Sequence, residues 1–165
     1  MKFSSRLRTL YESCVPGQPL VDLCCDHGYL GIHAFASKQF PEIVFVDQAK
    51  HGMELLRQKF EQHADLAAHP TKIQLITSDA GELNITLKGT VVIAGVGGVN
   101  MMHILSRLEH RGLLQAETLV LAPHRHRELY DVEFLFKFKR ISVKEVIEKS
   151  IVRPIFVFKR LENGI

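Results

Sequence analysis

The chain has no run of about 20 consecutive apolar residues, the length that a membrane-spanning helix needs, so we expect no membrane partner. Residues 1–15 lack the apolar core of a secretory signal, and this predicts a cytoplasmic protein. Cysteine is also scarce. Cys14, Cys24 and Cys25 include no C-x-x-C pair, which argues against a disulfide framework or a zinc knuckle and favours reduced thiols.

The composition fits one domain covering residues 1–165. Hydrophobic residues make up 46% of the chain and charged residues 24%, which is ordinary for a folded domain. The net charge is +3 and the pI is near 8.8. Such a mildly basic balance is compatible with a polyanionic partner but does not prove one.

The sequence is organised around residues 20–30, LVDLCCDHGYL. An apolar strand enters a polar turn at Asp26, His27 and Gly28, and a helix leaves it. This pattern is typical of the first unit of a nucleotide-binding α/β fold. The backbone N–H groups of the turn and of the helix N-terminus then face the ligand.

The rest of the chain repeats this alternation. Further strands are predicted at 43–46, 73–76, 90–94 and 118–122. Helices are predicted at 4–14 and 51–63, and after the strands at 90–94 and 118–122. Two last β-rich runs, 139–147 and 151–159, are too close for a crossover helix and must be antiparallel. We therefore predict five strand–helix units in an α/β fold, a mostly parallel doubly wound sheet with an antiparallel C-terminal hairpin.

Ligands of such sheets lie beyond the carboxyl ends of the strands. Five predicted strands end in polar or glycine-rich turns, at 26–28, 47, 79, 95–98 and 124–127. The agreement of five separate turns is stronger than any one of them. It predicts a binding site along this edge.

Two acidic residues carry the most specific expectations. Asp47 lies about twenty residues after the first turn, where a carboxylate accepts the ribose hydroxyls of a nucleoside; the alternative is a helix cap. Asp79 follows the third strand and can accept from an adenine amino group; the alternative is an Asx-turn.

The G-x-G-x-x-G fingerprint of dinucleotide-binding proteins is absent, and Cys24 stands where its first glycine is expected. This disfavours a nicotinamide reductase and favours a donor without phosphates, such as S-adenosylmethionine. The donor's amino group would suit Asp22 or Asp26, although Asp26 suits a helix N-cap equally well. Gly28 would let the helix begin close to the ligand.

The turn after the fourth strand contains Gly95, Gly97 and Gly98. It predicts a bare floor where a transferred group and a flat base can approach, or else only a flexible turn. The turn after the fifth strand contains His124, Arg125 and a further His-Arg pair at 126–127. We expect no metal there, but a basic lip for phosphates, extended by Arg6; a solvated charged surface is the alternative.

Several segments form a recognisable set of motifs: SRL at 5–7, VPG at 15–17, DLCCDHGYL at 22–30, SDAG at 78–81, IAGVGG at 93–98 and LVLAPH at 119–124. In this order they resemble the TrmK family, bacterial tRNA (adenine-N1) methyltransferases that act on adenine 22. The family's counterparts are D-I-G-S-D-H-A-Y-L-P, G-D-G-L, I-A-G-M-G-G and L-I-L-Q-P-N. The resemblance covers nearly the whole chain.

The resemblance implies a class I Rossmann-like methyltransferase that uses S-adenosylmethionine and methylates N1 of an adenine in tRNA, with the base splayed from its stack. The implied cofactor-binding residues are Asp22, Cys24, Gly28, Asp47, Gln48, Asp79, Ala80, Ala94 and Gly95. The implied catalytic residues are Asp26, His27 and Tyr29, with Asp26 facing the cationic product and the two rings orienting or stacking the base. The implied acceptor and RNA-binding residues are Arg6, Gly97, Gly98, Pro123, His124 and Arg125.

Three departures from the family pattern leave alternatives open. Cys24 replaces a glycine, and Ala122 and His124 replace the glutamine and asparagine of Q-P-N. The sequence ends at Ile165 without the family's C-terminal helical extension, so tRNA binding is expected to be weaker, differently organised, or dependent on a homodimer or protein partner that replaces the extension. The alternative functions are methylation of another RNA or a small molecule, and a non-catalytic binding module with the same fold.

Overall fold

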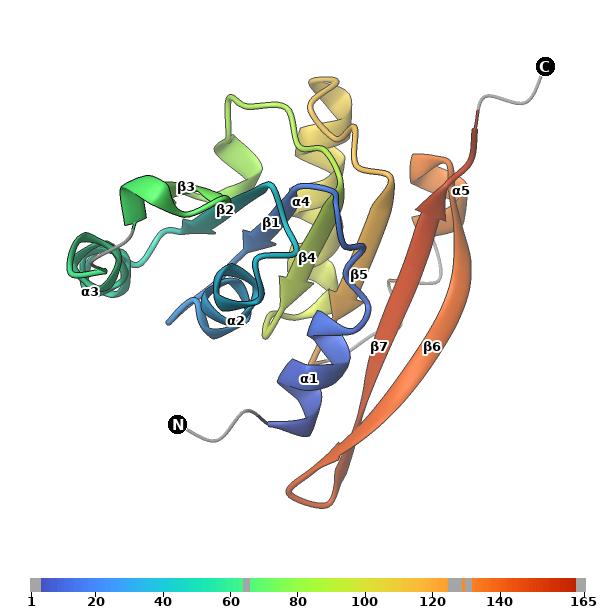
Figure 1. Cartoon of the computed structure of the whole chain (residues 1–165). Helices are drawn as coiled ribbons and strands as arrows, with labels where there is room; N and C mark the ends of the chain where they lie inside the picture. The colour runs from blue at the N-terminus through green and yellow to red at the C-terminus, as the bar shows by residue number, and fades with distance from the viewer. Residues whose placement is uncertain (1–3, 64–65, 125–128, 130–131, 163–165) are drawn as a thin grey trace.

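The computed structural model describes residues 4–63, 66–124, 129 and 132–162 and forms one seven-stranded sheet with helices on both faces (Figure 1). The helices are α1 (Ser5–Tyr11), α2 (Tyr29–Ser37), α3 (Lys50–Glu61), α4 (Gly98–His110) and α5 (Val132–Phe136). The strands are β1 (Leu20–Leu23), β2 (Glu42–Asp47), β3 (Lys72–Thr77), β4 (Thr90–Ala94), β5 (Thr118–Ala122), β6 (Phe138–Glu148) and β7 (Ile151–Arg160). Two short 3₁₀ turns are η1 (Leu66–Ala68) and η2 (Ala80–Glu82).

The strand order is β3-β2-β1-β4-β5-β7-β6. Strands β1 to β5 are parallel, and β7 is antiparallel to both β5 and β6. The predicted fold class is therefore confirmed. Because the order reverses between β1 and β4, the crevice beyond their carboxyl ends is the expected ligand position.

Both faces of the sheet are covered, so its central strands are apolar on both sides. One core packs alternate residues such as Val21 and Val91 against α4, and the other packs Leu20 and Val92 against α2 and α3. This two-sided burial explains why the central strands read as continuous hydrophobic runs rather than alternating ones.

One predicted strand–helix unit is wrong. After β3 the chain forms only the 3₁₀ turn η2 in the 12 residues between Thr77 and Thr90. Leu83 and Leu87 of this segment are buried in the core. The first helix is also shorter than predicted: it begins after Ser4, whose hydroxyl accepts a hydrogen bond from the Leu7 N–H, and it ends at Tyr11, with Glu12 as its C-cap.

The β6–β7 hairpin extends past the carboxyl ends of the parallel strands, on the same side as their terminal turns (Figure 1). Helix α1 packs against this arm: Arg6 pairs with Glu148 at 3.3 Å, and Lys144 donates to the Ser13 hydroxyl. In the described part of the chain, no helix is long and apolar enough to cross a membrane.

Candidate active site

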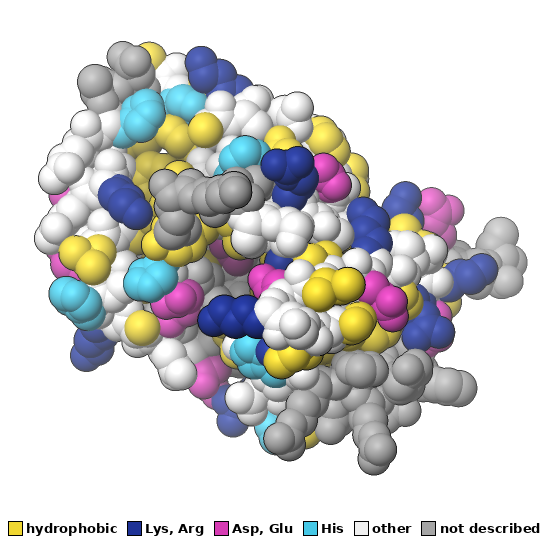
Figure 2. Space-filling view, turned by 90° about the horizontal axis from the view of Figure 1, so that it is seen from below, with side chains coloured by type: hydrophobic (Ala, Val, Ile, Leu, Met, Phe, Trp, Pro, Cys, Tyr) yellow, Lys and Arg dark blue, Asp and Glu magenta, His cyan; other side chains and the backbone are white. Residues whose placement is uncertain are grey.

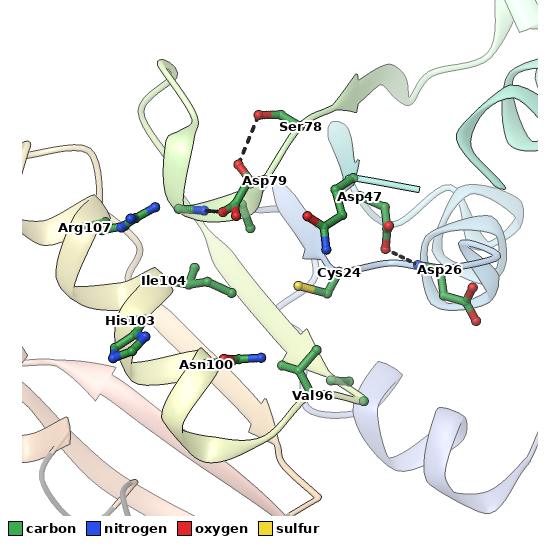
Figure 3. Close-up of a pocket in the computed structure, with 15 residues that line it drawn as sticks. Cys24, Asp26, Asp47, Ser78, Asp79, Val96, Asn100, His103, Ile104 and Arg107 are labelled. Atoms are coloured by element: carbon green, nitrogen blue, oxygen red, sulfur yellow. Dashed lines mark hydrogen bonds between the residues drawn. The ribbon is translucent and has the colours of Figure 1, made fainter. Parts of the chain in front are cut away.

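A pocket of about 550 Å³ lies at the carboxyl ends of β1 to β4, with α4 forming one wall (Figure 3). We call it the donor pocket. It is lined by seven of the nine predicted cofactor-binding residues: Cys24, Asp47, Gln48, Asp79, Ala80, Ala94 and Gly95. Asp26 stands at its edge, with a largely exposed side chain that points away from Cys24 (Figure 3).

Asp47 is the last residue of β2, and its carboxylate links the turn after β1 to the turn after β2. Its Oδ2 accepts from the backbone N–H of Asp26 at 2.9 Å, and its Oδ1 accepts from the N–H of Ala49 at 2.8 Å. Each carboxylate oxygen has a second acceptor position, so ribose hydroxyls can still bind. The Asp47 contact also fixes Asp26 in a left-handed backbone conformation with φ of 51°.

Asp79 precedes η2 and makes the Asx-type contact that was one of its two predicted roles. Its Oδ1 accepts from the Gly81 N–H at 2.7 Å. This bond orients the carboxyl group along the pocket wall and leaves Oδ2 available. The structural and the ligand-binding role of Asp79 are therefore compatible.

Arg107 of α4 and Arg111, the residue that caps the C-terminus of α4, hold the turn that follows Asp79. Arg111 donates to the Gly81 carbonyl at 2.6 Å and to the Asn84 side chain at 3.3 Å, while Arg107 pairs with Glu82. A Cβ on Gly81 would lie 3.0 Å from the Arg107 Cδ, so a glycine lets the helix approach this closely. Helix α4 thus positions the Asp79 carboxyl through side chains.

Cys24 lines the donor pocket in a left-handed conformation, with φ of 58°. Glycine adopts this conformation without strain, which explains why the TrmK motif has glycine here. Partial burial, followed by the negative charges of Asp47 and Asp22, raises the pKa of the Cys24 thiol to about 11. Cys25 is buried, whereas Cys24 is half-buried.

The glycine-rich turn after β4 forms part of the floor. Gly95 has φ of 77° and open space where a Cβ would lie, so ligand atoms can approach its backbone. Gly97 and Gly98 do not line the pocket; Gly98 is buried at the start of α4. Of the three glycines that were predicted to form a bare floor, only Gly95 lines the donor pocket, next to Ala94.

The sequence prediction missed one face of α4. Asn100, His103, Ile104 and Arg107 line the pocket and come from successive turns of that helix (Figure 3). Their spacing of three or four residues could have revealed them, because the opposite stripe of Met101, Leu105 and Leu108 is buried. Ser78, Gly81 and Val96 complete the lining.

A model of a family described as "Methyltransferase domain" matches residues 3–148 of the chain. The chain belongs to this methyltransferase-domain family. A Mycoplasma genitalium relative, MG248, named as a candidate tRNA methyltransferase, is 27% identical over 96% of the chain and 69% of its own length. The tRNA (adenine(22)-N(1))-methyltransferase of Bacillus subtilis is 28% identical over 89% of the chain and 60% of its own length.

Solved structures agree on the methyltransferase fold. The B. subtilis TrmK structure matches with a TM-score of 0.83 and 21% identity, over 98% of this chain and 68% of that one. The M. capricolum TrmK complex with S-adenosyl-homocysteine matches with a TM-score of 0.77 and 16% identity, over 97% and 72% of the two chains. The predicted resemblance to the TrmK family is confirmed, as is the predicted methyltransferase class.

Two predicted cofactor-binding residues of the methyltransferase lie outside the donor pocket. Asp22 is buried in β1, and burial raises the pKa of its carboxyl to about 7, although a hydrogen bond from the Gly31 backbone opposes this. Gly28 begins α2, but a Cβ there would lie 2.8 Å from Leu56 and 3.2 Å from Phe45. The glycine is therefore needed for helix packing rather than for approach to a ligand.

His27 and Tyr29 are not in the donor pocket either, contrary to their predicted catalytic positions. Their rings lie 5.4 Å apart and line a second hollow between α2 and α3. The left-handed conformations of Asp26 and Gly28 reverse the chain direction on both sides of His27, so sequence neighbours of Asp26 leave its pocket. Asp26 is the only one of the three predicted catalytic residues that lines the donor pocket.

The predicted acceptor residues lie beside the donor pocket rather than in its lining. Pro123 is buried, and the His124 N–H donates to the Val96 carbonyl at 3.0 Å, so the β5 turn is joined to the β4 turn. Arg6 donates to the Ala122 carbonyl at 2.9 Å and pairs with Glu148, so it holds protein groups instead of extending a free basic surface. Arg125 lies outside the described residues.

Charge at this edge is mixed. Figure 2 looks onto the carboxyl-end edge, and its coloured side chains show lysines and arginines spread among acidic, apolar and histidine side chains. In residues 4–63, 66–124, 129 and 132–162, no group of three or more histidine, cysteine or acidic residues is arranged to hold a metal ion. Recognition in the described site therefore depends on individual side chains.

Proposed function

We propose that the chain is an S-adenosylmethionine-dependent methyltransferase of tRNA that methylates N1 of an adenine. The observation that carries this proposal is the acidic, glycine-floored donor pocket. Asp26, Asp47 and Asp79 line it, and Arg107 is already paired with Glu82. Such a pocket favours a ligand with positive charge and hydroxyl groups and disfavours phosphates.

The residues present fit the donor. Asp47 stands where it can accept both ribose hydroxyls, and Asp79 where it can accept an adenine amino group. The exposed backbone of Gly95 leaves room for the reacting end of the donor. When bound, the donor supplies an electrophilic methyl group on a positively charged sulfur.

The acceptor chemistry requires little from the protein. Adenine N1 has a free lone pair, so no general base is needed, and proximity and orientation can provide most of the rate enhancement. The product base is cationic. Asp26, at the pocket edge, is the candidate to stabilise that charge, because its carboxyl is largely exposed.

The tRNA substrate is supported by the relatives' names and by the motif resemblance. Position 22 is the position printed for the Bacillus subtilis relative. The chain spans 60% of that relative and 69% of the Mycoplasma genitalium one. We infer a cytoplasmic location from the substrate, since tRNA modification occurs there.

The test is transfer of a labelled methyl group from S-adenosylmethionine to unmodified tRNA, followed by digestion to nucleosides. We expect label in 1-methyladenosine, and none with an otherwise identical tRNA carrying guanine at position 22. Label in another nucleoside would indicate a different RNA substrate. Binding of S-adenosylhomocysteine without label in any RNA would contradict the proposal and favour a small-molecule acceptor or a binding module.

A further inference from the structure

A second hollow, of about 380 Å³, lies between α2 and α3 and has no role in the proposed donor site. We call it the tyrosine hollow. Its walls are formed by His27 and Tyr29 on one side and by Leu55, Gln58 and Lys59 on the other. The sequence suggested catalytic roles for His27 and Tyr29, and the structure separates both of them from the donor pocket.

The chemistry of the tyrosine hollow is aromatic and cationic. The His27 side chain is 56% exposed, and its ring lies at 45° to the Tyr29 ring. The Lys59 ammonium lies 5.6 Å from the centre of the Tyr29 ring, and Leu55 is 45% exposed beside it. An exposed His27 ring and a partly exposed Tyr29 ring beside a cation are features that can hold a nucleotide, through base stacking and a phosphate contact.

The two hollows meet at adjacent residues. Asp26 lines the donor pocket, His27 lines the tyrosine hollow, and the His27 Nε2 lies 3.7 Å from the Asp26 Oδ2. A strand that presents one base at the donor pocket would therefore pass its neighbouring nucleotide over His27. Because acidic side chains of the donor pocket repel phosphates, the RNA backbone needs a cation outside that pocket.

We propose that the tyrosine hollow binds a nucleotide next to the target adenine, with its base against the His27 and Tyr29 rings and its phosphate at Lys59. This inference rests on the proposed function, since it assigns a place to the RNA substrate of the same site. It assigns substrate positioning, not chemistry, to His27 and Tyr29.

The test compares Tyr29→Leu, Tyr29→Phe and Lys59→Gln, with Lys88→Gln as the control. Lys88 is an exposed lysine before β4, at the opposite edge of the sheet. Dissociation constants for tRNA and for S-adenosylhomocysteine are measured together with kcat and KM. Binding of S-adenosylhomocysteine also shows that each variant is folded.

We expect Tyr29→Leu and Lys59→Gln to weaken tRNA binding roughly fivefold or more, because stacking on one aromatic ring and one phosphate contact are lost. Tyr29→Phe, which keeps the ring, and Lys88→Gln should stay within about twofold of wild type. Lys59→Gln should also lower the slope of log affinity against log salt by about one. Affinity for S-adenosylhomocysteine should be unchanged, and KM for tRNA should rise together with the loss of tRNA binding.

The outcomes separate this inference from the proposed function. Suppose that the wild-type protein methylates tRNA and that Tyr29→Leu and Lys59→Gln bind tRNA as tightly as the wild type does. This result would overturn the inference about the tyrosine hollow and leave the proposed function standing. Weakened binding of S-adenosylhomocysteine in these variants would place the hollow in the donor site and also overturns the inference. If the wild-type protein binds tRNA without methylating it, the proposed function is contradicted. The tRNA affinities of the variants would still show whether the tyrosine hollow binds a nucleotide. A wild-type protein that binds no RNA overturns both.

Discussion

The donor pocket and the tyrosine hollow share a rim at Asp26 and His27 but differ in charge and in construction. The donor pocket is lined by three acidic side chains, and its arginine is paired with Glu82. Among the described residues that line the tyrosine hollow none is acidic, and Lys59 stands there beside two rings. Neighbouring surfaces of opposite character suit a reaction between a cationic donor and a polyanionic acceptor.

The two regions are also built differently. The donor pocket is formed at strand ends, and its key carboxylates accept from backbone N–H groups, while Arg111 holds the adjoining turn at the Gly81 carbonyl. The tyrosine hollow is formed by side chains on two helix surfaces, whose rings and ammonium contact one another. Substitutions should therefore disturb the donor pocket through its geometry and the hollow through loss of single contacts.

The largest expected effect is that of Asp47→Asn on donor binding. The substitution removes the charge and places an amide N–H₂ against a backbone N–H of Asp26 or Ala49. We expect the dissociation constant for S-adenosylhomocysteine to rise at least tenfold, since hydrogen bonds to a charged group contribute about 1.5–3 kcal/mol. Isothermal titration calorimetry measures it directly.

The control for Asp47→Asn is Glu54→Gln, an exposed acidic residue of α3 that pairs with Arg57 and accepts a hydrogen bond from the Gln58 side chain. Binding of tRNA without donor should change little in either variant. Unchanged donor affinity in Asp47→Asn would contradict the ribose assignment. An equal loss of tRNA affinity would show that the two regions are not separate sites.

A smaller effect concerns stability and pH. Burial, together with a smaller effect of the negative charge of Asp47, raises the pKa of Asp22 to about 7 against the opposing hydrogen bond from the Gly31 backbone. An unfolded aspartate ionises near pH 3.9, so between these values the native state binds a proton that the unfolded state has lost. The contribution of Asp22 to the free energy of unfolding therefore falls as pH rises from about 4 to 7.

Asp22→Asn should remove this loss, because asparagine does not ionise. The variant should gain stability over wild type as pH rises, by at most about 4 kcal/mol near pH 8, because each pH unit between the unfolded and the folded pKa of Asp22 corresponds to about 1.36 kcal/mol. Melting temperatures of both proteins at pH 5 and pH 8 provide the comparison. An equal difference at the two pH values would show that Asp22 is ionised in the folded protein at both.

Much of the fold could be predicted because it depends on local pattern. The bounds of β4 and β5 agree with the hydrophobic runs at 90–94 and 118–122, since both strands are buried on two faces. The hairpin followed from two β-rich runs too close for a crossover. The prediction of five strand–helix units failed at β3, where the chain forms a 3₁₀ turn and buries Leu83 and Leu87 in the core instead of forming a helix.

The candidate site was predicted where it depends on strand ends and missed where it depends on backbone direction. Asp47 and Asp79 follow strands directly, so topology alone placed them in the donor pocket. The positions of His27 and Tyr29 depend on left-handed residues at 26 and 28, which give no pattern in the sequence. Arg111 acts through a carbonyl 30 residues away, a contact visible only in the folded chain.

The smallest expected effect tests whether the floor of the donor pocket is strained. Cys24→Gly and Cys24→Ala both remove the thiol, so their difference isolates the backbone conformation. With φ of 58° at this position, glycine avoids a left-handed penalty of roughly 1–2 kcal/mol, partly offset by its greater unfolded-state entropy. We expect the glycine variant to be more stable than the alanine variant by about 1 kcal/mol in urea unfolding. An alanine variant of equal or greater stability would mean that the turn is not left-handed in solution, and the donor pocket would then lose the one feature that explains a glycine in the TrmK motif.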